Sequence, residues 1–392
     1  MTFYTQSNTF GGAYGGAYGG AYGGAYGGGY GGAYGGAYGG AYGAAVSSSP
    51  LLADGLNKMR EAIALPDILN YRYPIADKAI PPIDLDTISK LKRCDSAVIA
   101  NLSQQDLWTN LRFVRTAVDQ LSLNVVGVNV RSKLTARDGV TLIRPTQQKF
   151  IGELQYVADL AELREDRGAE ILTQIGGLLA YLALVIPIST ERTPATLRIL
   201  DMAAGLATSV YSRFKTEFGC LRPIEMSPQI QSVVPAPGHA AYPMGHATTS
   251  FMLVHILTEL MRKHDPVAAD LAAKPLRDLA FRVSYNRIIA GVHFPIDLSA
   301  GIALGTWLGR YFMAAASATT PEWTEKNKMF DPAKDKGLTA IEKDLGKCFE
   351  PSPAGTSIFF DGQSGALHYL MLMAGSEWSW LKRPLPSTGP TV

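Results

Sequence analysis

Cysteine is scarce in this chain of 392 residues, which contains only Cys94, Cys220 and Cys348. These residues lie far apart and match no metal-ligand spacing, and so small and odd a number does not suggest a disulfide framework. The scarcity favours a reducing compartment. Charge is also low, with 18% charged residues and a net charge of +2. The chain therefore has no strong charge of one sign that would indicate nucleic acid or an acidic membrane as a partner.

A secretory signal is not recognisable either. Residues 1–10 carry no basic segment and no apolar segment follows them, so we expect a cytoplasmic protein. Residues 171–190 form an uncharged run of the length that a membrane helix needs. That run is isolated and contains Thr173 and Gln174, which favours a core helix of an all-α protein. We therefore expect no integral membrane segment.

Charged residues are absent from the N-terminal region, where the first one is Asp54. Residues 11–42 are instead eight tandem tetrapeptides, seven GGAY and one GGGY. Side chains of this kind cannot bury enough surface to offset the entropy of the backbone, so we predict that residues 1–49 form a disordered tail. Its tyrosines could serve in adhesion or self-association, or the tail could be a neutral linker. The sequence leaves both hypotheses open.

The remaining chain indicates a mainly helical domain. Hydrophobic residues make up 47% of the sequence, which is enough for a substantial core. From Pro145 to Ala316 they recur at helical spacing, interrupted at prolines and glycines. We predict an all-α (mainly α) fold, with a helical-bundle core at 145–316 in a single catalytic domain at 50–392. Further stretches expected to be helical are 51–63, 84–120, 145–166 and 364–374.

One short region departs from the helical pattern. Valine and leucine alternate with polar residues in 122–144, around the turn-forming sequence Arg137-Asp138-Gly139, which predicts a small β-hairpin. The segment from residue 317 onward is rich in proline, glycine and charge. We expect it to wrap the core irregularly, with one or two short helices.

The first motif that could form part of an active site is KTEFGCLRP, residues 215–223. Lys215 and Arg222 are seven residues apart, so on one helix they would project from nearly the same face. Pro223 would stop that helix directly after Arg222. Two cations on one face can bind an anion, although such a pair alone is more often a solvated surface.

The second motif is PAPGHAAYPMGH, residues 235–246, which precedes an apolar helical run. Gly245 and His246 should lie at the N-terminus of that helix. Unpaired backbone N–H groups and the helix dipole favour a bound oxyanion there. His246 can in addition exchange a proton near neutral pH.

The third motif is NRIIAGVHFPID, residues 286–297. Arg287 and His293 would not share a face of a straight helix, but the glycine and proline in this segment predict a bend that turns both inward. Asp297 follows His293 by four residues and can accept its Nδ1–H, which would leave Nε2 free as a ligand or nucleophile.

Together the three motifs predict one site. Three fixed cations, a helix N-terminus and two histidines suit a tetrahedral or trigonal-bipyramidal oxyanion, such as a phosphoryl group in transfer or vanadate. Packing alone does not explain such a joint pattern. The predicted site residues are Lys215, Arg222, Gly245, His246, Arg287, His293 and Asp297.

In this order and spacing, K-x6-R-P, P-x-G-H and R-x5-H-x3-D resemble the signature of the type 2 phosphatidic acid phosphatase and vanadium haloperoxidase superfamily. The resemblance covers residues 215–297 directly. The stretch RPIEMSPQIQSVVPAPGHAAYPMGHAT, residues 222–248, is similar to the soluble, haloperoxidase-like bacterial members. Vanadate as cofactor and a possible homodimer are what this resemblance implies.

The resemblance also implies how vanadate would be held. His293 would be the metal ligand, through Nε2. Lys215, Arg222 and Arg287 would balance the charge of the oxygens, and Gly245 would supply a backbone N–H.

Catalytic roles follow from the same resemblance. His246 would be the acid and base, and Asp297 would hold His293. Lys215 would polarise hydrogen peroxide for attack by halide. His239 lies seven residues before His246, where a histidine is typical of bromoperoxidases, so the halide would be bromide or iodide.

Two positions depart from the family pattern. Met244 stands where the second motif usually has serine, and methionine cannot donate a hydrogen bond to an oxyanion. Thr248 or Thr249, in the next helical turn, could replace the lost donor. Asn286 stands where the third motif usually has serine; it keeps polar donors and an acceptor.

Three functions stay open. The first is a vanadate-dependent haloperoxidase that uses hydrogen peroxide and halide to halogenate an organic acceptor. The second is a soluble, metal-independent acid phosphatase that forms a phosphohistidine at His293. The third is a weakly active relative whose tail is the working part, as an adhesive or structural module.

Overall fold

The structure is a computed structural model. It describes residues 50–63, 140–316 except 176–177 and 190–191, 365–378, and short segments within 123–136 and 322–359. The predicted tail at 1–49 and the predicted helix at 84–120 lie outside the described residues. Both stay predictions, as does the domain boundary at residue 50.

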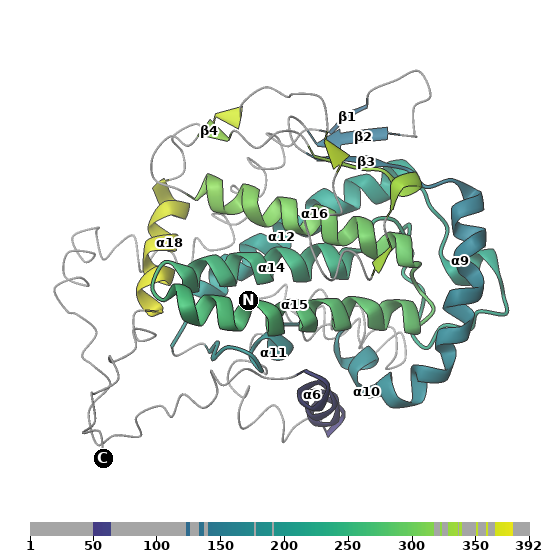
Figure 1. Cartoon of the computed structure of the whole chain (residues 1–392), viewed down its shortest axis with the longest axis horizontal. Coiled ribbons are helices and arrows are strands. Elements are labelled where there is room, and N and C mark those ends of the chain that lie inside the picture. Colours follow the sequence, from purple (N-terminus) through teal and green to yellow (C-terminus); the bar gives the residue numbers. More distant parts are fainter. Residues whose placement is uncertain are drawn as a thin grey trace, which may run out of the picture.

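Four long helices form the core (Figure 1). α14 (Gly245–Arg262) lies at its centre and packs against α12 (Pro194–Phe218), α15 (Pro266–Ile289) and α16 (Pro295–Ala315). Three of the four begin at a proline, whose fixed φ suits the first helical position. Buried apolar side chains from all four form one continuous cluster. The predicted mainly α bundle is confirmed.

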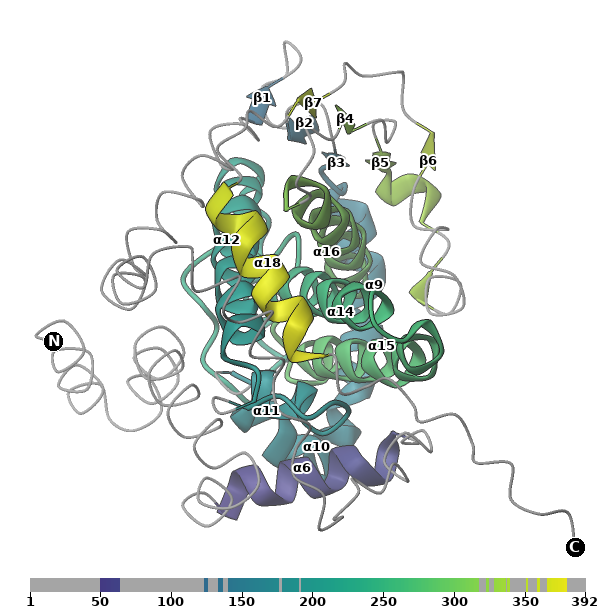
Figure 2. The same cartoon turned by 90° about the vertical axis from the view of Figure 1, so that its left-hand side faces the viewer.

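Shorter helices flank this core. They are α6 (Pro50–Ala62), α9 (Gln147–Asp159), η3 (Leu160–Leu163), α10 (Arg164–Thr173), α11 (Leu178–Leu182), α13 (Pro223–Met226), η4 (Pro332–Lys334) and α18 (Gly365–Glu377). α10 packs against α6 and α15, and α18 packs along α12 (Figure 2). The helices predicted at 51–63, 145–166 and 364–374 are confirmed by α6, by α9 with α10, and by α18.

The uncharged run at residues 171–190 is not one core helix, so that prediction was wrong. α10 ends at Thr173 and α11 spans five residues before the chain turns. A Gly-Gly pair lies between them in the sequence, and glycine has the lowest helix propensity after proline. The described part of the chain contains no helix that combines the length and the apolar character needed to cross a membrane.

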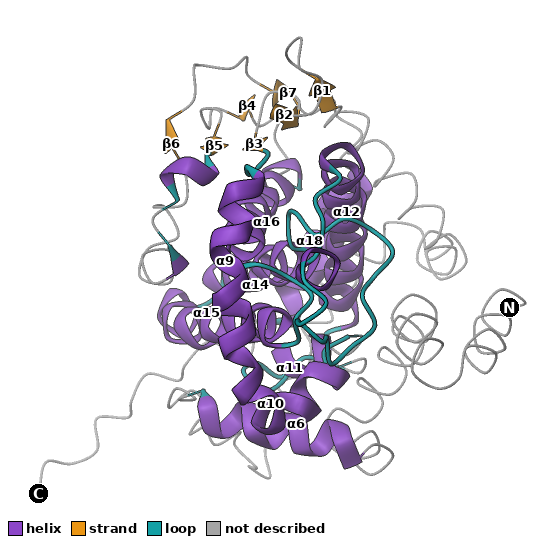
Figure 3. Ribbon diagram, turned by 90° about the vertical axis from the view of Figure 1, so that its right-hand side faces the viewer, coloured by secondary structure: helices purple, strands orange, loops and turns teal. Residues whose placement is uncertain are grey.

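A small sheet lies at one end of the helices (Figure 3). β2 pairs antiparallel with β3, Lys133 opposite Ile143, which confirms the predicted hairpin; its turn, 137–139, lies outside the described residues. The segment after 317 is more regular than predicted, because β5 adds to β3 in parallel and β4 pairs with β7. The strands are β1 (Leu123–Val125), β2 (Lys133–Ala136), β3 (Val140–Ile143), β4 (Glu322–Trp323), β5 (Lys328–Phe330), β6 (Glu350–Pro351) and β7 (Ile358–Phe359).

α14 and α16 approach each other closely along a stripe of glycines on α16. A Cβ added at Gly301 would lie 2.7 Å from the Met244 carbonyl oxygen, and one added at Gly305 would overlap the Thr248 carbonyl oxygen. At Gly309 it would lie 2.8 Å from the His255 Cβ. Only glycine permits this contact between backbones, which fixes the start of α14 against the start of α16.

Candidate oxyanion-binding site

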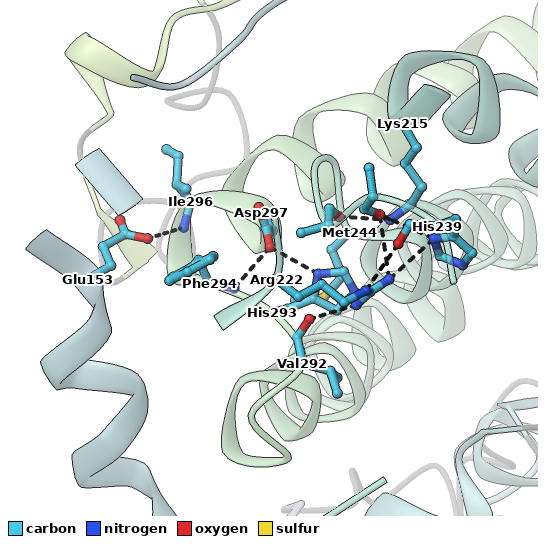
Figure 4. A network of polar contacts seen from close by, with 12 residues as sticks. Glu153, Lys215, Arg222, His239, Met244, Val292, His293, Phe294, Ile296 and Asp297 are labelled. Atoms are coloured by element: carbon cyan, nitrogen blue, oxygen red, sulfur yellow. Dashed lines mark hydrogen bonds and ion pairs between the residues drawn. The ribbon is translucent and has the colours of Figure 1, made fainter. Parts of the chain in front are cut away.

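The three motifs converge where the C-terminal part of α12, the N-terminus of α14 and the N-terminus of α16 meet. The Met244 N–H donates to the Asp297 carbonyl oxygen at 2.9 Å, which joins the starts of α14 and α16. Glu153 of α9 accepts from the Ile296 N–H at 3.0 Å, so its carboxylate caps α16 (Figure 4). The three motifs, which are separate in the sequence, thus lie together in the structure.

His293 is held as predicted. Its Nδ1 lies 3.0 Å from Asp297 Oδ2, which also accepts from the Phe294 N–H at 2.9 Å. Pro295 starts α16 directly after this turn, so Asp297 in the first helical turn faces back toward the histidine. Burial raises the pKa of Asp297 to about 7. Asp297 Oδ1 is buried and has no partner among the described residues.

The other nitrogen of His293 is engaged, which differs from the expectation that it is free. Arg222 Nη1 lies 3.3 Å from Nε2. Because a guanidinium has no lone pair, Nε2 must be the acceptor, and Nδ1 carries the ring proton. Burial, then Arg222 and Lys215, lower the pKa of His293 well below its usual value. The ring is therefore neutral and presents a lone pair to the cationic side of the site.

Arg222 does not lie on the helix of Lys215, so that part of the prediction was wrong. α12 ends at Phe218, and Gly219 adopts the left-handed conformation with φ of 58°. Arg222 is extended and precedes α13, which Pro223 begins rather than stops. The glycine ends the helix because it adopts this conformation without a Cβ penalty. The two cations meet through the turn instead of through a shared helical face.

Backbone carbonyls hold both cations. Lys215 Nζ donates to the carbonyl oxygens of Ala240 and Ala241, each at 2.7 Å. Arg222 donates to the carbonyl oxygens of His239, at 3.1 Å, and Val292, at 2.7 Å. Burial and the field of Arg222 lower the pKa of Lys215 well below its usual value. Lys215 and Arg222 are both buried, and two neighbouring buried positive charges favour an anion beside them.

Gly245 and His246 begin α14, as predicted. A Cβ at Gly245 would lie 2.9 Å from Cζ of the Tyr211 ring, so only glycine fits under that ring. His246 Nε2 lies 3.3 Å from the Gln174 carbonyl oxygen, which can only accept, so Nδ1 bears the lone pair. Burial and then Arg287 lower the pKa of His246 to about 3. This histidine is neutral at pH 7 before an anion binds.

Arg287 completes the cationic set from the C-terminal end of α15. Its Nη2 donates to the Ile171 carbonyl oxygen at 2.7 Å, and burial lowers its pKa to about 10, so it stays charged. Its Nε is buried without a partner among the described residues. An unsatisfied buried donor costs about 1–3 kcal/mol, and more when the group is charged. An oxyanion would remove that cost, so the residues present fit vanadate or phosphate.

Two residues, His239 and Met244, were expected to tune the site. His239 lies at its exposed edge, and Met244 is buried beneath it. His239 is exposed, and its Nδ1 lies 3.2 Å from Arg222 Nη2. Met244 is fully buried as the N-cap of α14. The Thr248 hydroxyl donates to the Met244 carbonyl oxygen at 2.9 Å, so Thr248 is not the replacement donor. Thr249 is partly buried, and its role stays a prediction.

Sequence reasoning missed a group of polar residues on α10. Glu170 is fully buried and accepts three hydrogen bonds from Arg282, at 2.6, 3.0 and 3.3 Å, and one from Asn286 at 2.8 Å. Gln174 at the end of α10 contacts His246, Asn286 and Arg287. The available signal was the presence of Gln174 in a run that is mostly apolar.

Comparison with protein-family models matches residues 197–321 to the PAP2 superfamily. A search of curated proteins found no significant match to the chain. The matched residues contain the parts of α12, α14, α15 and α16 that carry all three motifs. This superfamily includes both phosphatases and haloperoxidases. On this match, the chain carries a PAP2 superfamily domain at residues 197–321.

Proposed function

We propose that the protein is a vanadate-dependent haloperoxidase that oxidises bromide or iodide with hydrogen peroxide and so halogenates an organic acceptor. For bromide, hydrogen peroxide, bromide and one proton give hypobromous acid and water. Hypobromous acid then replaces a hydrogen of the acceptor by bromine and releases a second water. The observation that carries the proposal is the neutral His293, held by Asp297, with its Nε2 lone pair among buried cations.

Each predicted residue has a role in this proposal. His293 would hold vanadate through Nε2, after Arg222 Nη1 turns from that nitrogen to an anion oxygen. Lys215 and Arg287 would neutralise further oxygens, and Gly245 would donate its backbone N–H. When bound, vanadate would supply the Lewis acidity that activates hydrogen peroxide.

Two histidines would handle the proton and the halide. His246 Nδ1 carries a lone pair in the neutral ring, so it can take up the proton that the reaction consumes and deliver it to an oxygen leaving as water. His239 is exposed and contacts the same Arg222 that contacts His293. An exposed histidine beside Arg222 could contact an incoming halide, and on this ground we propose bromide or iodide as substrate.

Acid phosphatase chemistry is the second candidate, and the same lone pair favours it. Neutral His293 Nε2 could attack phosphorus and form a phosphohistidine, while the oxygen of the leaving group takes a proton from His246. The cations that would hold vanadate would equally stabilise the five-coordinate transition state. The two functions therefore need an assay to separate them.

The deciding assay is bromination of monochlorodimedone with bromide and hydrogen peroxide, with and without orthovanadate. We expect turnover only after orthovanadate is added. Hydrolysis of p-nitrophenyl phosphate is measured in parallel without vanadate. Phosphatase activity that orthovanadate inhibits, with no bromination, would replace the proposal with the second candidate.

Anion binding is expected to draw a proton into the site. Because the pKa of His246 is about 3, and because a bound anion would offset the field of Arg287, binding should raise that pKa. Between the two pKa values the bound form holds more protons, so affinity rises as pH falls. Calorimetric titration with inorganic phosphate at pH 6, in buffers of different ionisation enthalpy, should show uptake of up to about one proton more than in His246→Gln.

The parent protein and His246→Gln are compared at the same pH, so the contribution from protonation of phosphate itself is the same in both and cancels. Equal uptake in both proteins would assign the proton to another group. His264→Gln is the matched control, since this histidine follows the far end of α14.

A further inference from the structure

Gln174 connects three elements around the candidate site. It caps the C-terminus of α10, and only 1% of its surface is exposed. Its backbone carbonyl oxygen faces His246 Nε2 at 3.3 Å. Its side-chain Oε1 accepts from Asn286 Nδ2 at 2.9 Å and faces Arg287 Nη2 at 3.4 Å. Two predicted site residues therefore contact this one glutamine.

A relay of hydrogen bonds fixes which way the Gln174 amide points. Glu170 can only accept, and Asn286 Nδ2 donates to it at 2.8 Å as well as to Gln174. Arg167 Nη1 donates to Asn286 Oδ1 at 3.3 Å, which fixes the Asn286 amide from its other side. Gln174 must then present Oε1 to Asn286, so its Nε2 faces away from this relay.

The relay leaves Gln174 Nε2 as a buried amide donor with no partner within the described part of the chain. Arg287 Nε, on the residue that Gln174 contacts, is buried and unpartnered in the same way. Buried donors are nearly always satisfied in folded proteins. Gln174 and Arg287 contact each other beside His246. One anion bound there could accept hydrogen bonds from both unpaired donors.

This donor matters because the start of α14 lacks the side-chain hydroxyl of the family motif. The Met244 side chain is fully buried and carries no hydrogen-bond donor, and the Thr248 hydroxyl donates to the Met244 carbonyl oxygen. We propose that Gln174 Nε2 is the oxyanion-binding donor that replaces the serine hydroxyl of the family motif, with Asn286 as its positioning residue. The two departures from the family pattern, Met244 and Asn286, then compensate for each other. This inference rests on the proposed oxyanion site, whether its chemistry is halogenation or phosphate transfer.

The test is a double-mutant cycle on anion binding. Calorimetry measures the affinity of each variant for orthovanadate and, separately, for inorganic phosphate. Gln174→Met removes the donor at similar volume and should weaken binding by about 10–100-fold, the usual range for a hydrogen bond to a charged group. Met244→Ser alone should change affinity by less than about 3-fold, since a donor is already present. The double variant should regain at least about 10-fold of the loss.

Asn286→Ser tests the positioning role, because it releases the Gln174 amide while leaving the donor in place. We expect weaker binding that Met244→Ser restores, with smaller changes than in the Gln174→Met pair. Gln155→Met on α9 is the matched control for glutamine replacement; it lies on an exposed face and should bind like the parent protein. If Gln174→Met does not fold, Gln174→Glu keeps the acceptor toward Asn286, removes the donor, and should weaken binding at least as much.

The outcomes separate this inference from the proposed function. Parent-like binding by Gln174→Met, or no recovery in the double variant, would overturn the role of Gln174. Failure of the parent protein to bind either anion would instead overturn the oxyanion site itself.

Discussion

Replacing His293 with alanine is expected to abolish orthovanadate binding and turnover while the protein stays folded. The change removes a ring whose Nδ1 is held by Asp297 and whose Nε2 lone pair faces Arg222. Loss of a ligand's supporting partner typically costs 10–100-fold in affinity, so loss of the ligand should cost at least about 100-fold. Calorimetry with orthovanadate measures the affinity, and circular dichroism checks the fold.

The Asp297 contact gives a graded comparison. Asp297→Asn keeps the shape of the side chain but weakens the hold on His293 Nδ1, so binding should fall by about 10–100-fold rather than vanish. His264→Ala should bind like the parent, because it removes a histidine beyond the other end of α14. Unchanged binding in His293→Ala would refute the whole assignment of the site.

Local sequence features predicted where α14 begins and how Asp297 holds His293. Gly245 and His246 begin a helix because an apolar helical run follows them directly. Asp297 holds His293 because the two are one helical turn apart at a helix start, where a side chain can reach back. Both predictions concern contacts within a few residues, where spacing alone constrains geometry.

One local signal was misread. Gly219 ends α12 in the left-handed conformation, and a glycine after an apolar helical run is the common sign of a helix end. The prediction instead placed the end at Pro223. Lys215 and Arg222 still meet, because both donate to carbonyls of the same loop, residues 239–241.

Contacts between distant segments could not be predicted. Gln174 and Asn286 are 112 residues apart in sequence, and no periodicity indicates that α10 ends beside α15. The parallel pairing of Val140 with Lys328 is of the same kind. Such contacts depend on how whole elements pack, so they follow from the fold and not from any single stretch of sequence.

The close packing of α14 and α16 determines where both helices begin, and hence the site. α14 presents Gly245 and His246. α16 presents Asp297, which orients His293 (Figure 4). The glycine stripe on α16 lets the two helices pack closely from these N-terminal ends onward. A residue larger than glycine in the stripe must move one helix relative to the other, because interiors are packed too densely to absorb an added carbon.

Gly305→Ala is therefore expected to destabilise the fold and weaken anion binding together. Helix propensity alone would favour alanine by about 1 kcal/mol. The added Cβ would overlap the Thr248 carbonyl oxygen, however, and a backbone atom cannot rotate away as a side chain can. We expect a net loss of roughly 2–3 kcal/mol of unfolding free energy, typical of overpacking, measured by denaturant unfolding with orthovanadate binding measured alongside.

Gly152→Ala is the matched control, since Gly152 lies within α9 and an added Cβ there meets no atom within 4 Å. Only the gain in helix propensity remains, so stability should rise by about 0.5–1 kcal/mol and binding should not change. If Gly305→Ala behaved like this control, α14 and α16 would have room to separate without moving the site. The close backbone contact would then not be what positions His246 and His293.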